Sequence, residues 1–139
     1  KLGWAPDVIH CHGWMTSLVP IYIKKAFKDN PLFTDTKVVF SIYDDAFDEM
    51  LSLDFAKKIK IDGITNKDLT HYQTPTYTNI LKAAIDFSDA VFVSTNNLNP
   101  EIKAYLDRSN KPKMDLITLD NHIQVYNDFF NEMLKDKTD

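Results

Sequence analysis

Residues 6–14 read PDVIHCHGW and hold the clearest structural signal in this chain of 139 residues. The apolar run Val8–Cys11 is typical of a buried strand, and Gly13 ends it. His12 and Trp14 lie where a helix is expected to begin. Ligands of open α/β proteins bind where parallel strands end and helices begin. This segment therefore predicts a strand-to-helix unit with polar side chains at a binding position.

Two more strands are predicted, because Lys37–Tyr43 (KVVFSIY) and Ala90–Val93 (AVFV) are rich in β-branched and aromatic residues. Strands that alternate with helices indicate a parallel sheet covered on both faces. The predicted fold is α/β, a Rossmann-like three-layer architecture with a short parallel sheet. Helices are expected at 15–28 with an internal bend at Pro20, at 48–60, after Thr74-Pro75, after Asn99-Pro100 and at 120–135, with an irregular segment at 63–74.

Composition excludes several classes of function. The net charge is −4, so nucleic acid and anionic membranes are not expected as partners. Apolar runs are far shorter than the roughly 20 residues that span a bilayer. The single cysteine, Cys11, excludes an internal disulfide framework and fits a reducing compartment, so we expect a cytoplasmic location.

The chain is expected to be part of a longer protein. It begins with Lys1, and its first strand starts within ten residues of that end, so preceding strands are expected to complete the sheet. Residues 1–118 are interpreted as a partial Rossmann-like domain and 119–139 as a C-terminal helix that docks on it. The helix carries an apolar stripe of Ile123, Tyr126, Phe130, Met133 and Leu134. That stripe leaves a second interpretation open, in which the helix binds a protein partner.

The carboxyl ends of parallel strands share one edge, so residues 12–14, 43–45 and 94–97 should lie together. Hydroxyl and imidazole groups can hydrogen-bond sugar hydroxyls, and an indole can offer an aromatic face. The alternative is that each group only satisfies a loop or a helix end. The candidate substrate-binding residues are His12, Trp14, Tyr43, Asp44 and Ser94.

No metal or cofactor is predicted. His10 and His12 share one face of their strand, but Cys11 points to the other and cannot join them. His10 is therefore predicted to be a core histidine bonded to the backbone. The glycines match neither a dinucleotide fingerprint nor a P-loop, and Ser94 lacks the context of a nucleophile elbow.

An acidic cluster follows the second strand, at Asp44, Asp45, Asp48 and Glu49. These carboxylates could orient sugar hydroxyls or hold a cation. Alternatively they form a solvated loop with helix-start carboxylates, which the helix dipole favours. The second interpretation is preferred for all of them except Asp44.

Several motifs resemble, in order, the N-terminal domain of bacterial glycogen and starch synthases: PDVIHCHGW, a helix with an internal proline, KVVFSIYDDAF, ILKAAIDFSDAVFVS and NPEI. The family segments read like PDVVHAHDW, VFTIHNLAYQG and FLKAG-x-x-YADKVTTVSPTYAxEI, and the match covers about residues 5–105. The resemblance implies part of a glycosyltransferase-B fold. It also implies glucose transfer, with retention, from a nucleotide diphosphate glucose (ADP-glucose or UDP-glucose) to an α-1,4-glucan.

The resemblance also assigns positions. Matching residues are His12, Trp14 and Ser94. Gly13 replaces a functionally important aspartate, Tyr43 replaces the histidine that contacts glucose, and Asp44 replaces an asparagine. The family's nucleotide loop and basic second domain do not occur in this sequence, and a diphosphate leaving group needs such charge stabilisation. We therefore expect this chain to be inactive alone; the alternative is a degenerate, non-catalytic domain that binds a sugar or a partner.

Overall fold

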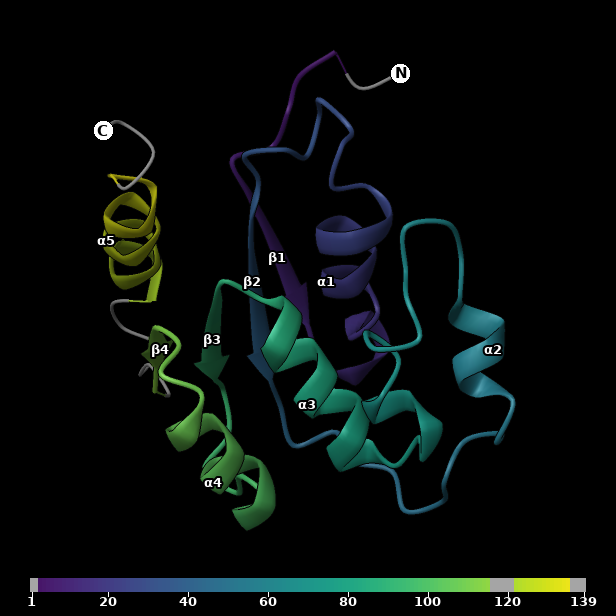
Figure 1. Cartoon of the computed structure of the whole chain (residues 1–139). Coiled ribbons are helices and arrows are strands. Elements are labelled where there is room, and N and C mark those ends of the chain that lie inside the picture. Colours follow the sequence, from purple (N-terminus) through teal and green to yellow (C-terminus); the bar gives the residue numbers. More distant parts are fainter. Residues whose placement is uncertain (1–2, 116–121, 136–139) are drawn as a thin grey trace.

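The computed structural model describes residues 3–115 and 122–135 and centres on one parallel sheet (Figure 1). Its strands lie in the order β1-β2-β3-β4. They are β1 (Val8–His12), β2 (Lys37–Ile42), β3 (Ala90–Val93) and β4 (Lys113–Met114). The three predicted strands are confirmed. The fourth has two residues, too few to show a hydrophobic period.

Helices cover both faces of the sheet, as predicted for a three-layer fold. Figure 1 shows α1 (Val19–Ile21) and α3 (Tyr77–Phe87) on one side of the strands and α5 (His122–Lys135) on the other. The helix α4 (Pro100–Arg108) shares the core of α3. The remaining short elements are a 3₁₀ turn η1 (Trp14–Thr16), a π turn η2 (Tyr22–Ala26), the α-helix α2 (Phe55–Ile59) and a 3₁₀ turn η3 (His71–Gln73). Among the described residues, no helix is both long and apolar enough to cross a membrane.

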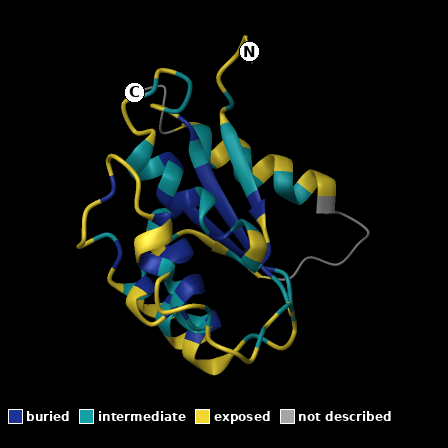
Figure 2. Ribbon diagram, turned by 90° about the vertical axis from the view of Figure 1, so that its right-hand side faces the viewer, coloured by how far each residue is buried: buried dark blue, intermediate teal, exposed yellow. Residues whose placement is uncertain are grey.

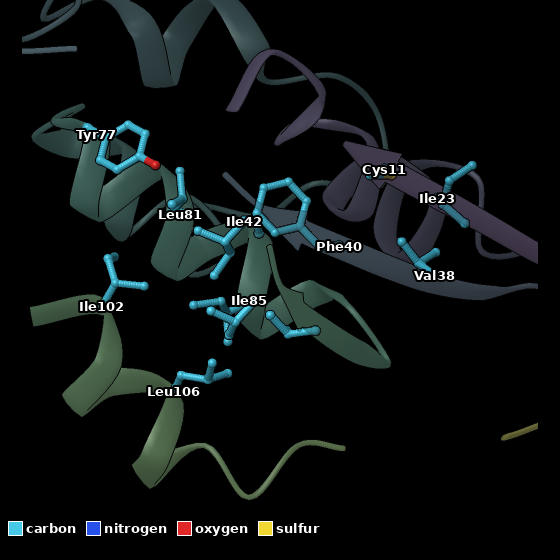
Figure 3. Close-up of a cluster of buried hydrophobic side chains, with 13 residues drawn as sticks. Cys11, Ile23, Val38, Phe40, Ile42, Tyr77, Leu81, Ile85, Ile102 and Leu106 are labelled. Atoms are coloured by element: carbon cyan, nitrogen blue, oxygen red, sulfur yellow. The ribbon is translucent and has the colours of Figure 1, made fainter. Parts of the chain in front are cut away.

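The two faces of the sheet carry separate hydrophobic cores. Alternate strand residues such as Phe40 and Val91 pack with α3 and α4, and Figure 3 shows Ile85 of α3 beside Leu106 of α4. The opposite face, with Val39 and Phe92, packs against α5. Figure 2 shows buried residues concentrated in the strands and exposed ones in the loops. This alternation follows from the two-residue period of a strand.

Two helix starts test the capping predictions. Asn99 caps α4 as predicted, since its side chain accepts from the backbone N–H groups of Glu101 and Ile102. The predicted start of α3 at Thr74-Pro75 is wrong by two residues. Thr76 is extended there, and its hydroxyl accepts from the N–H of Asn79.

One predicted helix is confirmed in part and one is largely wrong. In residues 15–28 the turn η1 is followed by a helical stretch at 19–26, where α1 runs directly into η2. Pro20 lies in the first turn of α1, where its missing N–H breaks no helical bond. Of residues 48–60 only Phe55–Ile59 is helical. The irregular segment 63–74 nevertheless supplies core residues that pack against α1 and α3: Ile64, Leu69 and Tyr72.

The C-terminal helix α5 packs its aromatic stripe on the chain's own sheet. Tyr126 stacks on Phe92 with ring centroids 5.1 Å apart, and Phe129 and Phe130 also contact Phe92. The predicted boundary between 118 and 119 lies outside the described residues, so the division into two units stays a prediction.

Candidate functional site

The parallel register brings the predicted site residues to one edge of the sheet. His12 pairs with Ser41, and Ile42 pairs with Val93, so the three strands end at a similar height. The backbone N–H of Gly13 donates to the carbonyl of Ser41, and that of Ser94 donates to Ile42. This ladder places the first residues after each strand side by side.

His12 and Tyr43 form a direct pair at this edge. The Nδ1 atom of His12 lies 2.9 Å from the Tyr43 hydroxyl. His12 is exposed, and Tyr43 is half-buried. Their side chains come from residues 31 positions apart, so only the sheet brings them together. The pair offers an imidazole and a phenol to a ligand with hydroxyl groups.

His10 lies beneath His12 and is held in its neutral form. The rings of the two histidines are 4.0 Å apart, and the Nε2 atom of His10 lies 2.7 Å from the Ser41 hydroxyl. Burial, and secondarily the neighbouring His12, lower the pKa of His10 to about 4. The predicted backbone partner is therefore wrong: a side-chain hydroxyl takes that place.

Residues 3–115 and 122–135 contain no group of three or more His, Cys, Asp or Glu side chains placed to hold a metal ion. Cys11 is buried on the face opposite His10 and His12, and burial raises the pKa of its thiol to about 11. The contacts that His10 and His12 make are with the hydroxyl groups of Ser41 and Tyr43.

Trp14 and Asp44 follow the first two strands but differ in exposure. The Trp14 ring packs against Phe47, with centroids 4.8 Å apart, and is partly buried at the edge of the core. Asp44 is exposed and accepts a hydrogen bond of 3.2 Å from the Asn97 amide. Tyr43, Asp44 and Asn97 line a hollow of about 30 Å³, which is water-sized rather than sugar-sized.

Ser94 lies at the end of β3 and contacts the C-terminal helix. Its side chain hydrogen-bonds the hydroxyl of Tyr126 on α5, where burial raises the tyrosine pKa. Tyr126 therefore reaches the site edge, a position that the sequence analysis did not assign to it. Helical spacing identified Tyr126 as apolar surface, and the pattern held no sign of its hydroxyl contact.

Asp45 is the site residue that sequence reasoning placed wrongly. It is half-buried, not a solvated loop carboxylate. Its Oδ2 accepts the backbone N–H of Trp14 at 2.9 Å, and its Oδ1 accepts the hydroxyl of Tyr77 at 3.1 Å. Burial, and then the charge of Asp45, raise the pKa of Tyr77. Asp48 and Glu49 are exposed, as expected.

Gly13 leaves space for that carboxylate. Its φ is +71° and its ψ is 171°, a combination that side-chain-bearing residues avoid. A Cβ atom at this position would lie 2.5 Å from Asp45 Oδ2. The sequence signal for this contact was Gly13 after the first strand together with two successive aspartates, Asp44 and Asp45, after the second.

Comparison with known proteins shows which family this chain resembles. The family model described as starch synthase catalytic domain matches residues 1–109. The chain is 32% identical over 105 residues to the glycogen synthase of Lachnospira eligens, which covers 73% of this chain and 21% of that protein. It is 29% identical over 106 residues to the glycogen synthase of Photobacterium profundum, covering 76% and 21%.

A third match covers a shorter segment of the chain at higher sequence identity. A 43-residue segment is 44% identical to the glycogen synthase of Pelodictyon phaeoclathratiforme, covering 31% of this chain and 9% of that protein. The chain spans about a fifth of the length of the first two relatives. Its parallel sheet between helical layers agrees with the Rossmann-like glycosyltransferase-B domain that the sequence resemblance implies. This chain therefore belongs to the starch synthase catalytic domain family.

Proposed function

We propose that the chain is part of a glycogen or starch synthase-type glycosyltransferase and that its strand-end edge binds a glucosyl unit. The family match over residues 1–109 carries this proposal. The ligand classes are a nucleotide diphosphate glucose, either ADP-glucose or UDP-glucose, and an α-1,4-glucan. We also propose a cytoplasmic location, which the single buried thiol of Cys11 supports.

The chemistry of the site suits a neutral, hydroxyl-rich ligand. His12 and Tyr43 can each donate or accept a hydrogen bond, and Asp44 can only accept. Ser94 adds a hydroxyl at the end of β3. We propose these four residues as sugar contacts, with Trp14 fixing the edge of the site through its contact with Phe47.

Transfer by this chain alone is not expected. A departing diphosphate needs cationic stabilisation, and the groups that follow β2 are the carboxylates of Asp44 and Asp45. Like charges at short range raise the energy of a bound diphosphate. We infer that the stabilising groups belong to parts of the family's proteins outside this stretch.

A second candidate function is non-catalytic binding of a sugar or of a protein partner. It is favoured by Gly13 and Tyr43, which depart from the family pattern quoted above. The aromatic stripe of α5 packs on Phe92 of the same chain, so a partner would have to displace the helix or use its outer face.

Titration of the 139-residue chain with maltoheptaose and with ADP-glucose, followed by amide chemical shifts, tests the proposal. We expect shifts confined to the ends of β1, β2 and β3, and weaker binding by His12→Ala than by the control His71→Ala. Spectra unchanged by both ligands would overturn the sugar site. Incorporation of radiolabelled glucose into glycogen by the chain alone would overturn its inactivity.

A further inference from the structure

We propose that Asp45 is a ligand-contacting residue of the strand-end site, presenting to sugar hydroxyls a carboxylate for which Gly13 makes room. This inference rests on the proposed function and deepens it. The acidic cluster as a whole does not carry it, because Asp48 and Glu49 are exposed. Asp45 differs because two other elements hold its carboxylate in place.

The carboxylate is held in one orientation. One oxygen accepts from the backbone of Trp14, at the start of η1, and the other accepts from Tyr77 of α3. Each carboxylate oxygen offers about two lone-pair positions, so each keeps capacity for one further donor. The result is a fixed, half-buried acceptor that needs no reorganisation when a hydroxyl arrives.

The charge of this acceptor selects its ligand class. Asp45 and its neighbour Asp44 present two carboxylates at the end of β2. A phosphate would be repelled at this position, whereas a sugar hydroxyl donates a charge-assisted hydrogen bond. We therefore assign Asp45 to the neutral glucosyl part of a ligand and not to a diphosphate.

Gly13 and Asp45 depend on one another. A side chain at Gly13 would place its Cβ 2.5 Å from Asp45 Oδ2, so the β1 turn cannot carry a carboxylate while Asp45 keeps its position. The turn itself has φ +71° and ψ 171°, which only glycine adopts readily. The acceptor at this edge consequently comes from the β2 end rather than from the β1 end.

The same contacts reach the His12–Tyr43 pair. The Tyr77 hydroxyl, which bonds Asp45, also lies 3.3 Å from the Tyr43 carbonyl oxygen. The Tyr43 phenol in turn lies 2.9 Å from His12 Nδ1. Asp45 thus belongs to one connected polar group that spans β1, β2 and α3.

Titrations of wild type, Asp45→Asn and Asp48→Asn with maltoheptaose test the inference. Asp48→Asn is the matched control, since it removes an exposed carboxylate of the same acidic cluster to which no ligand contact is assigned. We expect Asp45→Asn to weaken binding at least tenfold and Asp48→Asn less than threefold. In wild type, the Trp14 backbone amide, which donates to Asp45, should shift on ligand addition; this readout does not depend on the variant folding.

The outcomes separate the two proposals. Wild-type binding with an unchanged Trp14 amide, or equal affinity of a folded Asp45→Asn variant, would overturn the role of Asp45 alone. No binding of maltoheptaose or ADP-glucose by wild type would overturn both the sugar site and this inference. Equal losses in Asp48→Asn and Asp45→Asn would also count against Asp45, because they would indicate a general effect of charge.

Discussion

The carboxylate of Asp45 lies directly over Gly13, with its Oδ2 atom 2.5 Å from the place that a Cβ of residue 13 would occupy. The two residues follow different strands, and the parallel pairing of β1 with β2 brings them together. Gly13 is the position where the family resemblance implies an aspartate. The backbone conformation at this position, with φ +71°, favours glycine, and a side chain there would displace the carboxylate of Asp45.

Substitution of Gly13 should therefore be costly. Gly13→Ala is expected to lower the free energy of unfolding by about 1–3 kcal/mol, because of its positive φ and the contact with Asp45. Gly3→Ala is the control, since nothing lies within 4 Å of a Cβ there. Urea unfolding of both variants measures the difference. Equal unfolding midpoints for the two variants would contradict the account of the turn.

A related expectation concerns activity. Gly13→Asp should not produce glucosyl transfer, since it adds a second carboxylate against Asp45 and leaves Tyr43 in place of the family's histidine. Incubation with labelled ADP-glucose and glycogen measures this. Transfer by that single variant would contradict our inference that the chain also lacks other groups needed for glucosyl transfer.

The stability of the chain should depend on the protonation of His10. Its pKa is about 4 in the folded state, against 6.5 as the ordinary value, so the unfolded chain binds the proton more readily. Neutral His10 makes its full contribution to the free energy of unfolding above pH 6.5, and this contribution is lost as the pH falls from 6.5 to 4. Since one pKa unit corresponds to about 1.4 kcal/mol, and solvent screens the partly exposed ring, the loss of unfolding free energy is less than about 3.5 kcal/mol.

Urea unfolding between pH 4 and pH 7 measures that dependence. His10→Gln, which has no titratable group, should lose less stability over this interval than wild type. Parallel curves for the two proteins would show that His10 is not held neutral by the fold.

The thiol of Cys11 should resist modification while the chain is folded. Cys11 is 3% exposed, and burial raises its pKa to about 11, so little of the reactive thiolate exists at pH 8. We expect Ellman's reagent to label the folded chain at least about 100-fold more slowly than the urea-unfolded chain. Comparable labelling rates in the two states would place Cys11 outside the core.

The docking of α5 can be tested with two variants on that helix. Tyr126 stacks on Phe92, whereas Ile123 is 68% exposed. Tyr126→Ala should cost about 1–3 kcal/mol of unfolding free energy, and Ile123→Ala should cost less than about 0.5 kcal/mol. Urea unfolding distinguishes them. If both variants matched wild type, α5 would not be docked on the sheet in solution.

Much of the architecture could be predicted because it depends on local patterns. The apolar runs at Val8–Cys11, Lys37–Tyr43 and Ala90–Val93 each formed a strand, since β-branched and aromatic residues suit a buried sheet. Asn99-Pro100 started a helix for a similarly local reason. The order of strands and helices then implied parallel pairing, and hence a shared edge for His12, Tyr43 and Ser94.

Other features depended on packing between distant segments. Residues 15–28 have a helical apolar spacing, and 19–26 are helical. A 3₁₀ turn at η1 and a π turn at η2 nevertheless replace a continuous α-helix where the segment packs against the irregular segment 63–74. The role of Tyr126 at Ser94 likewise required α5 to lie against β3.

The sequence by itself determined where strands form, where they end and which polar residues follow them, because backbone propensity and hydrophobic period act over a few neighbouring residues. Only the tertiary structure decided that the carboxylate of Asp45 lies over Gly13. That contact joins backbone and side chains more than 30 positions apart, as the bond of 2.9 Å from the Trp14 amide to Asp45 shows. Its geometry follows from strand register, turn conformation and the position of Tyr77 on α3, none of which is a local property.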